Sequence, residues 1–171
     1  MFDRLSRREF SVTLASAIGG TTWFFSPSVR TKDVTRRSEA IHQEVTLNAS
    51  AARVYAALTD AAQFTRLMAF SSMKSAPPAQ IASDAGGTFS LFGGHIIGRQ
   101  LELVPGQRIV QAWRVVDWPA GVYSIAKFEI ADRGGKSVLV FDHTGFPNGL
   151  GEHLAQGWRT NYWEPLKKYL A

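Results

Sequence analysis

Four histidines are the residues of this chain best suited to metal or acid–base chemistry: His42, His95, His143 and His153. No two of them are four residues apart, the spacing that turns two imidazoles on one helix face toward a shared metal. The chain has no cysteine, which excludes disulfides, thiolate-bound metals and a cysteine nucleophile. The sequence therefore predicts no metal and no cofactor, although His95, His143 and His153 could still assemble a zinc site through the fold.

Acid–base catalysis by a side chain would fall to Asp142, His143 or Arg99. Each of these would need a pKa shifted by a dry pocket, and the sequence permits such a pocket without pointing to it. No serine lies in the G-x-S-x-G pattern of a nucleophile elbow. We therefore predict no catalytic residue and interpret these groups as polar side chains that line a cavity, with His143 near its rim.

The final stretch, residues 149–171, predicts one long amphipathic helix. Large apolar residues recur along it at every fourth position: Leu150, Leu154, Trp158, Tyr162, Leu166 and Leu170. The face is aromatic as well as apolar, and a small-molecule pocket is mostly apolar with a few polar anchors. We therefore expect ligand contacts from six residues of this helix and of the strands before it: Arg99, Gln111, Trp113, His143, Trp158 and Tyr162.

Strands punctuated by turns fill most of the chain between residue 40 and this helix. Residues 41–47 alternate in hydropathy and predict a first strand, and Ser50 is a good N-cap for a helix that begins at Ala51. Six further strands are expected: 80–83, 88–92, 95–104, 107–116, 122–131 and 136–143. Short turns between strands favour an antiparallel meander, so the predicted fold class is α+β, with helices on one face of the sheet.

Alternation within these strands assigns side chains to faces. On the strand 95–104, the odd-numbered face carries Ile97, Arg99, Leu101 and Leu103. An arginine among apolar residues needs a partner or a wet cavity, which is why Arg99 is expected to face the ligand.

The positive charge of the chain is concentrated at its N-terminus. The formal net charge is +5, but residues 1–38 hold seven of the 19 basic residues and only three of the 14 acids. The remainder is therefore close to neutral and has no basic patch, which predicts that nucleic acid is not a partner.

The N-terminal tail has the layout of an export signal. Ser6-Arg7-Arg8-Glu9-Phe10 precedes a mildly apolar run from Ser11 to Phe25. A basic start followed by such a run is typical of a signal peptide, whereas a spanning helix needs about twenty residues. The string is similar to the twin-arginine export signal. We expect a twin-arginine signal peptide at 1–28, a basic linker at 29–40 and the folded domain at 41–171; the alternative is a disordered basic tail with a chance arginine pair.

Export would bring the chain to the twin-arginine machinery and place the folded protein in the periplasm or beyond. Small residues at Ser26 and Ser28 suit a cleavage site, but no clear A-x-A sequence is present. An uncleaved signal would anchor the protein to the membrane.

Short motifs in the domain resemble one protein family in their order and spacing. They are Val54-Tyr55-Ala56-Ala57-Leu58-Thr59-Asp60, Gly86-Gly87-Thr88-Phe89, Gly98, Leu103-Val104-Pro105, Arg108-Ile109-Val110, Ala112-Trp113-Arg114, Trp118-Pro119 and Gly157-Trp158. Together they resemble the bacterial SRPBCC proteins related to the activator of heat-shock protein 90 ATPase, within the START-like (birch-pollen-allergen-like) superfamily. The resemblance covers nearly the whole of 41–171. Relatives commonly carry a tryptophan where this chain has Phe64-Thr65-Arg66-Leu67, which implies a differently shaped pocket mouth.

The resemblance implies a helix-grip fold. In it a curved antiparallel sheet of about six or seven strands wraps around the long C-terminal helix, with a short helix after the first strand and a cavity between sheet and helix. The expected function is binding of a hydrophobic small molecule in that cavity, with no assigned reaction, because a fold by itself does not imply chemistry.

Two other functions remain open. Some superfamily members resemble cyclases or dehydratases, which would use Arg99 or His143 on a hydrophobic carbonyl substrate. The family name suggests a chaperone-activator role, but an exported protein would not meet cytosolic heat-shock protein 90.

Overall fold

The computed structural model describes residues 39–171 of the chain. The predicted export signal at 1–28 lies outside the described residues, as does nearly all of the predicted linker at 29–40. Within the described residues, no helix is both long and apolar enough to cross a membrane.

Seven strands of residues 39–171 form one antiparallel sheet, in the spatial order β1-β7-β6-β5-β4-β3-β2. They are β1 (Ala40–Leu47), β2 (Gln80–Ile81), β3 (Thr88–Leu91), β4 (Ile96–Val104), β5 (Arg108–Val115), β6 (Ser124–Asp132) and β7 (Ser137–Thr144). Strands β2 to β7 follow one another as a meander, and β1 pairs with β7 and forms the other edge of the sheet. The predicted antiparallel meander is confirmed.

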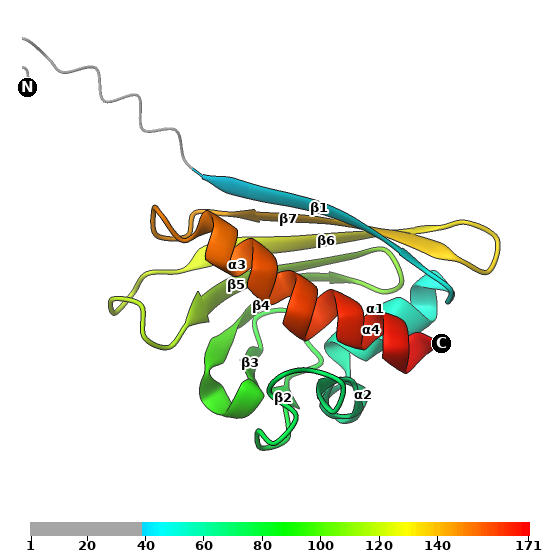
Figure 1. The fold of residues 1–171 in the computed structure, drawn as a ribbon, viewed down its shortest axis with the longest axis horizontal. Helices are drawn as coiled ribbons and strands as arrows, with labels where there is room; N and C mark the ends of the chain where they lie inside the picture. The colour runs from blue at the N-terminus through cyan, green and yellow to red at the C-terminus, as the bar shows by residue number, and fades with distance from the viewer. Residues whose placement is uncertain (1–38) are drawn as a thin grey trace, which may run out of the picture. The chain divides into compact units, whose positions relative to one another are not determined.

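The helices lie on one side of this sheet (Figure 1). Helices α1 (Ala51–Thr59) and α2 (Ala61–Met68) follow β1. The C-terminal helix consists of α3 (Gly151–Trp158), a π-helical turn η2 (Arg159–Trp163) and α4 (Glu164–Leu170), and it runs across the sheet. A curved antiparallel sheet that holds a long C-terminal helix is the predicted α+β helix-grip fold.

Side-chain caps divide the first helical segment into two helices. The Ser50 hydroxyl accepts from the Arg53 backbone N–H, which confirms Ser50 as the N-cap of α1. Asp60 has an extended backbone and its carboxylate accepts from the Gln63 N–H at 2.8 Å, so it ends α1 and starts α2. The apolar face of the segment therefore changes direction at Asp60.

The C-terminal helix starts with a cap supplied from the other end of the domain. The Glu39 carboxylate accepts hydrogen bonds from the backbone N–H groups of Gly149 and Gly151, both at 3.0 Å. These N–H groups have no partner within the helix, and a carboxylate also complements the positive end of the helix dipole. The residue just before β1 therefore fixes the start of α3.

A π-helical turn divides the C-terminal helix at Arg159–Trp163. Pro165 follows it at the start of α4, and a proline has no N–H to donate to the carbonyl four residues earlier. The wider turn accommodates that missing bond. Residues four apart drift by about 40° per step around a regular α-helix, and this drift accumulates along the helix. The wider turn offsets it, and the row Leu154, Trp158, Tyr162, Leu166 and Leu170 is buried along its whole length.

A bulge in β4 makes the predicted inward orientation of Arg99 wrong. The register with β5 shifts between Gln100 and Glu102, so Leu101 is an extra residue in β4. Before the bulge the even positions face the core: Ile96 and Gln100 are buried, whereas Arg99 is exposed. Only after the bulge does the odd position Leu103 turn inward. A one-residue insertion moves the side chains that follow it along the strand to the opposite face of the sheet from the one that simple alternation predicts.

Prediction: Gly98→Ala lowers the free energy of unfolding by about 2 kcal/mol or more, because a Cβ at Gly98 would lie 2.1 Å from the Ala112 carbonyl oxygen and 2.3 Å from the Phe89 ring. The carbonyl belongs to the β4–β5 pairing and cannot move without breaking it. The matched control is Gly157→Ala in α3, where an added Cβ contacts nothing within 4 Å. Helix propensity should make that variant more stable by up to about 1 kcal/mol. Urea unfolding of the three proteins would contradict the packing argument if Gly98→Ala matched the wild type.

Candidate functional site

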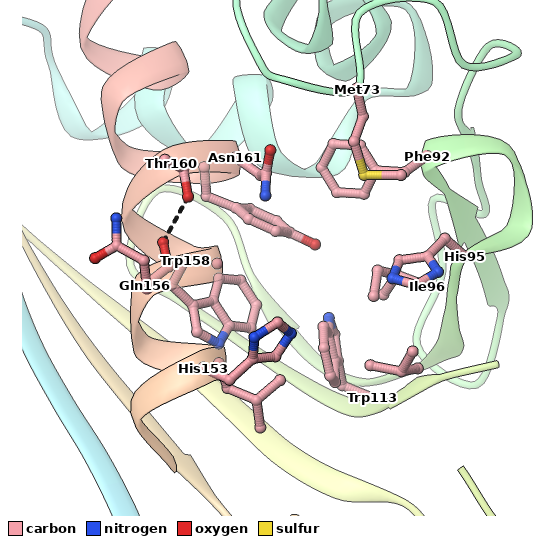
Figure 2. Close-up of a pocket in the computed structure, with 14 residues that line it drawn as sticks. Met73, Phe92, His95, Ile96, Trp113, His153, Gln156, Trp158, Thr160 and Asn161 are labelled. Atoms are coloured by element: carbon pink, nitrogen blue, oxygen red, sulfur yellow. Dashed lines mark hydrogen bonds between the residues drawn. The ribbon is translucent and has the colours of Figure 1, made fainter. Parts of the chain in front are cut away.

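A cavity of about 340 Å³ lies between the C-terminal helix and the sheet (Figure 2). The sheet side is formed by Ile96 of β4 and by Trp113 and Val115 of β5. The helix side is formed by residues of α3 and of the π-helical turn: His153, Leu154, Gln156, Gly157, Trp158, Thr160, Asn161 and Tyr162. Exposed side chains such as His153 and Thr160 mark where the cavity meets solvent.

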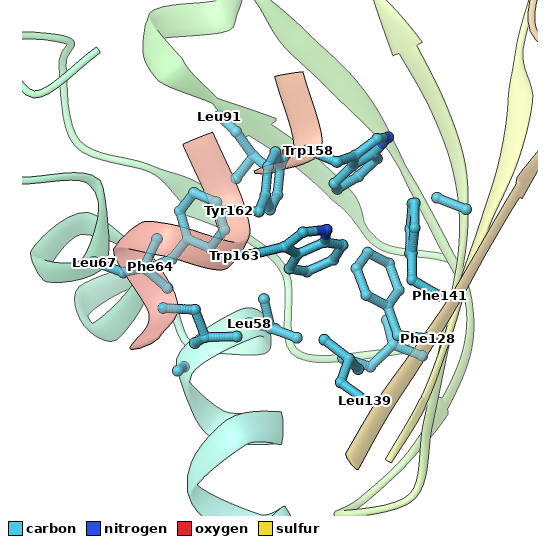
Figure 3. Packing of buried hydrophobic residues seen from close by; sticks show 14 of the residues in the cluster. Leu58, Phe64, Leu67, Leu91, Phe128, Leu139, Phe141, Trp158, Tyr162 and Trp163 are labelled. Carbon is cyan, nitrogen blue, oxygen red and sulfur yellow. The ribbon is translucent and has the colours of Figure 1, made fainter. Parts of the chain in front are cut away.

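An aromatic cluster forms the inner wall of this cavity and continues into the core (Figure 3). The rings of Trp158 and Tyr162 lie 4.2 Å apart between centroids, and Phe141 of β7 lies 4.3 Å from Trp158. Phe64 of α2 and Phe92 each pack edge-on against Tyr162. Because each ring is held by several others, the wall is rigid and exists before any ligand arrives.

Phe92 reaches the cavity from an unusual backbone conformation. It begins a short 3₁₀ turn, η1 (Phe92–Gly94), with φ of 52°, in the left-handed region that bulky residues rarely occupy. Its ring is nevertheless buried against Tyr162 and lines the cavity. Strain of this kind persists where the surrounding packing determines the conformation, and it gathers at ligand sites.

His143 is buried behind the cavity wall and belongs to a chain of hydrogen bonds. The Trp158 indole N–H donates to His143 Nδ1 at 3.0 Å. His143 Nε2 lies 2.7 Å from the Ser124 hydroxyl, which donates to the Trp113 backbone carbonyl at 2.8 Å. An indole N–H can only donate, so Nδ1 must be the acceptor and the proton of neutral His143 sits on Nε2. Each nitrogen of the imidazole is thus engaged.

This environment keeps His143 uncharged. Burial lowers its pKa from 6.5 to about 3, because the charged form would lose its hydration. With both nitrogens bonded inside the protein, His143 has no lone pair to offer a substrate. It therefore acts as a hydrogen-bonded link between helix and sheet and not as a general base; its predicted place at the cavity rim is wrong.

The other predicted ligand-contacting residues separate into two groups. Trp113, Trp158 and Tyr162 line the cavity together. Gln111 instead bonds Gln100 at 3.2 Å beside a separate void of about 10 Å³, room for about one water. Arg99 is on the exposed side of β4 and its guanidinium donates to the Gly86 carbonyl.

Sequence reasoning missed several residues that line the cavity. On the helix side, His153, Gly157 and Asn161 repeat the four-residue spacing one position before Leu154, Trp158 and Tyr162. That row flanks the apolar stripe and was a readable signal of a cavity edge. Met73 comes from the loop after α2, whose path the sequence pattern does not determine. Phe92 and His95 were expected at strand ends, and the structure places them in η1 and directly after it.

Within residues 39–171, two buried polar atoms of the cavity residues make no hydrogen bond of normal geometry. They are the Trp113 indole Nε1 and the Tyr162 hydroxyl. The Trp113 nitrogen points into the cavity in Figure 2. Native proteins pair nearly all buried polar groups with protein or water, so an unpaired group beside a cavity marks a place where a ligand or water can bind.

No metal site is evident in the part of the chain that the structure describes, where no three His, Asp or Glu side chains converge. His95 and His153 line the cavity, but His143 is buried behind it. A second hollow of about 350 Å³ lies between β1 and the C-terminal helix, near His42, Glu44, Arg159 and Lys167. Its charged, exposed lining fits an apolar ligand less well than the aromatic cavity.

Comparison with known proteins gives one consistent relationship. Residues 48–171 match the model of a family described as "Activator of Hsp90 ATPase homolog 1-like protein". The human activator of 90 kDa heat shock protein ATPase homolog 1 is 33% identical over 91 residues. That match spans 53% of this chain and only 27% of the human protein.

Solved structures agree on the fold. A crystal structure of a heat-shock protein 90 activator from Plasmodium falciparum has a TM-score of 0.69 at 26% identity, and covers 77% of this chain and 95% of that one. The solution structure of the Aha1 dimer from Colwellia psychrerythraea has a TM-score of 0.62 at 15% identity, with 77% and 96% covered. At the lower identity the likeness shows the fold alone.

Prediction: the buried His143 makes the protein less stable in mild acid. The folded-state pKa is about 3 and the unfolded value is 6.5, so the unfolded state binds the proton first as pH falls. Stability from this group is fully present above pH 6.5 and is lost toward pH 3, by about 2–3 kcal/mol between pH 7 and pH 4.5. His143→Gln keeps a donor and an acceptor but does not titrate. The stability difference between the two pH values should shrink by that amount in the variant, and urea unfolding at both pH values measures it. An unchanged difference would contradict the buried neutral imidazole.

Proposed function

We propose, for a chain that belongs to the activator of Hsp90 ATPase homolog 1-like family, that the domain binds an apolar or aromatic small molecule between its C-terminal helix and sheet. The observation that supports this most is the preformed cavity of about 340 Å³ with an aromatic wall. Cavities that hold small ligands have volumes of about 300–1,000 Å³ and mostly apolar linings. The proposal assigns no reaction.

Rigidity of the wall supports binding of a flat ligand. Trp158 and Tyr162 lie nearly in contact, and Trp113 packs 5.4 Å from Trp158 between ring centroids. The bond from Trp158 to His143 prevents its indole from turning out of the wall. A ligand would therefore bind surfaces that are already ordered, which limits the entropy lost on binding.

The polar residues around the cavity favour binding over catalysis. The two groups most suited to a carbonyl reaction, Arg99 and His143, do not line it. His95 and His153 do line it, at its solvent-facing side, where both side chains are exposed. Active sites commonly exclude water from the reaction, and the solvent-facing side of the cavity does not. Ligand binding is therefore the better-supported function.

Prediction: Gly157→Leu weakens ligand binding by filling the cavity, because Gly157 lines it and a Cβ added there would enter open space. N-phenyl-1-naphthylamine, a neutral dye that fluoresces in apolar sites, should bind wild-type protein saturably and the variant at least about tenfold more weakly. The matched control is Lys168→Leu, which adds the same side chain at an exposed position of α4 away from the cavity. Absence of saturable binding to the wild type would contradict the proposed function.

A second candidate function is activation of heat-shock protein 90. The human relative bears that name and shares 33% identity with about half of this chain. The aligned region covers about a quarter of the human protein, so the name describes a much longer molecule. The location of the protein distinguishes activation of heat-shock protein 90 from ligand binding alone. A cytosolic protein could meet a cytosolic chaperone, whereas an exported protein could not.

Prediction: Arg7→Lys with Arg8→Lys abolishes export, because a twin-arginine signal is read through its arginine pair. The chain would be fused to a reporter that is active only in the periplasm, and the double variant should reduce reporter activity to background. The control is the same change at the neighbouring pair, Arg36→Lys with Arg37→Lys, which should leave export intact. Export through a twin-arginine signal would be contradicted if both variants gave equal reporter activity, or if the wild-type fusion gave no reporter activity. Either result would favour the chaperone candidate.

A further inference from the structure

We propose that the cavity recognises a carbonyl oxygen of its ligand, held jointly by the Trp113 indole N–H and the Tyr162 hydroxyl. The ligand class is a flat aromatic ketone or quinone, whose rings contact the aromatic wall while its oxygen accepts from both groups. This inference rests on the proposed function, because it names what the cavity selects for among apolar molecules.

The two groups are the unpaired polar atoms of an otherwise satisfied wall. Trp113 and Tyr162 are only 3% and 5% exposed, and in the part of the chain that the structure describes neither polar atom makes a hydrogen bond of normal geometry. Unlike Trp113, both tryptophans of the C-terminal helix have a hydrogen-bond partner. The Trp158 N–H donates to His143, and the Trp163 N–H donates to Gln43. Of these three tryptophans, only Trp113, at the cavity, has an unpaired indole N–H among residues 39–171.

Ring contacts hold both side chains in place beside the cavity. Trp113 lies edge-on to Trp118 and His143, at centroid distances of 5.6 and 5.0 Å. Tyr162 is fixed by Phe64, Phe92 and Trp158. A hydrogen-bonding group that cannot turn elsewhere must be satisfied by a molecule that enters the cavity.

The chemistry of the two groups specifies an acceptor. An indole N–H can only donate, and burial raises the pKa of Tyr162, so its hydroxyl keeps its proton and can donate. The Trp113 N–H lies within hydrogen-bonding range of the Tyr162 hydroxyl and acts against that shift, but the two make no hydrogen bond of normal geometry, so both are left as neighbouring donors within residues 39–171. Two donors side by side suit one oxygen with two lone pairs, which is what a carbonyl presents.

Charge in the cavity favours a neutral ligand over a carboxylate. Among residues 39–171, no lysine or arginine lines the cavity. Arg99 faces away, and the Arg114 guanidinium is bonded to the backbone carbonyls of Val115, Val116 and Trp118. A carboxylate beside Trp113 and Tyr162 would lose its hydration without gaining an opposite charge, which is strongly unfavourable. A ketone or quinone oxygen meets the same two donors without that cost.

The experiment compares 9-fluorenone with fluorene, two molecules of nearly the same shape that differ in whether a carbonyl or a methylene closes the central ring. Equilibrium dialysis with the full chain should give a dissociation constant about tenfold lower for fluorenone than for fluorene. In Tyr162→Phe the preference should fall to about threefold or less, with the affinity for fluorene unchanged. The control is Tyr123→Phe at an exposed tyrosine outside the cavity, which should keep the wild-type preference.

Two further measurements separate recognition from a structural effect. Ligand-free Tyr162→Phe should unfold at a temperature no lower than the wild type, because the hydroxyl that it loses has no partner. The Trp113 indole N–H resonance should shift downfield with fluorenone and not with fluorene.

The outcomes distinguish this inference from the proposed function. Equal affinities for the two molecules, or an unchanged preference in Tyr162→Phe, would overturn carbonyl recognition and leave apolar binding intact; the two donors would then be serving water alone. Failure of the wild type to bind either molecule would overturn the proposed function and this inference with it.

Discussion

The hydrogen bond from the Trp158 indole to His143 is the interaction on which the rest of the domain depends. It joins the C-terminal helix to β7 inside the core, and through Ser124 it continues to the backbone of Trp113 in β5. Because the indole donates, every later bond in the chain has a fixed direction. These linked hydrogen bonds thereby fix the rings of the cavity wall. They use the Trp113 backbone carbonyl and leave the Trp113 indole N–H to face the cavity.

The π-helical turn is the second requirement, because it determines which side chains share the cavity wall. A regular helix would carry residues spaced by four progressively around its surface. The wider turn at Arg159–Trp163, next to Pro165, offsets this drift, so the row from Leu154 through Tyr162 to Leu170 stays buried. The irregular turn also contributes Tyr162 to the aromatic wall, and π-helical turns are frequent at functional sites.

Much of the fold was predictable from sequence, because hydrophobic period, caps and turn residues all point to one answer. The strands, the early helix and the helix-grip class were confirmed, and three of six expected ligand contacts line the cavity: Trp113, Trp158 and Tyr162. Arg99 was misplaced because one inserted residue in β4 reverses the side-chain alternation, and no sequence pattern marked that bulge. His143 was placed at the rim because alternation gives a face but not a depth; two tryptophan-bearing elements cover it in the fold.

The depth of His143 also changes what the cavity can do. A histidine at the rim could have taken a proton from a substrate, and the cyclase-like alternative depended on it or on Arg99. In the fold, neither Arg99 nor His143 lines the cavity. The cavity presents two buried polar groups, Trp113 Nε1–H and the Tyr162 hydroxyl, and both are neutral donors. Donors alone can hold and polarise an oxygen, but removal of a proton needs a base beside them. This arrangement favours the proposed binding of a ligand over catalysis, because any proton transfer would have to come from the exposed imidazoles of His95 and His153 or from the ligand itself.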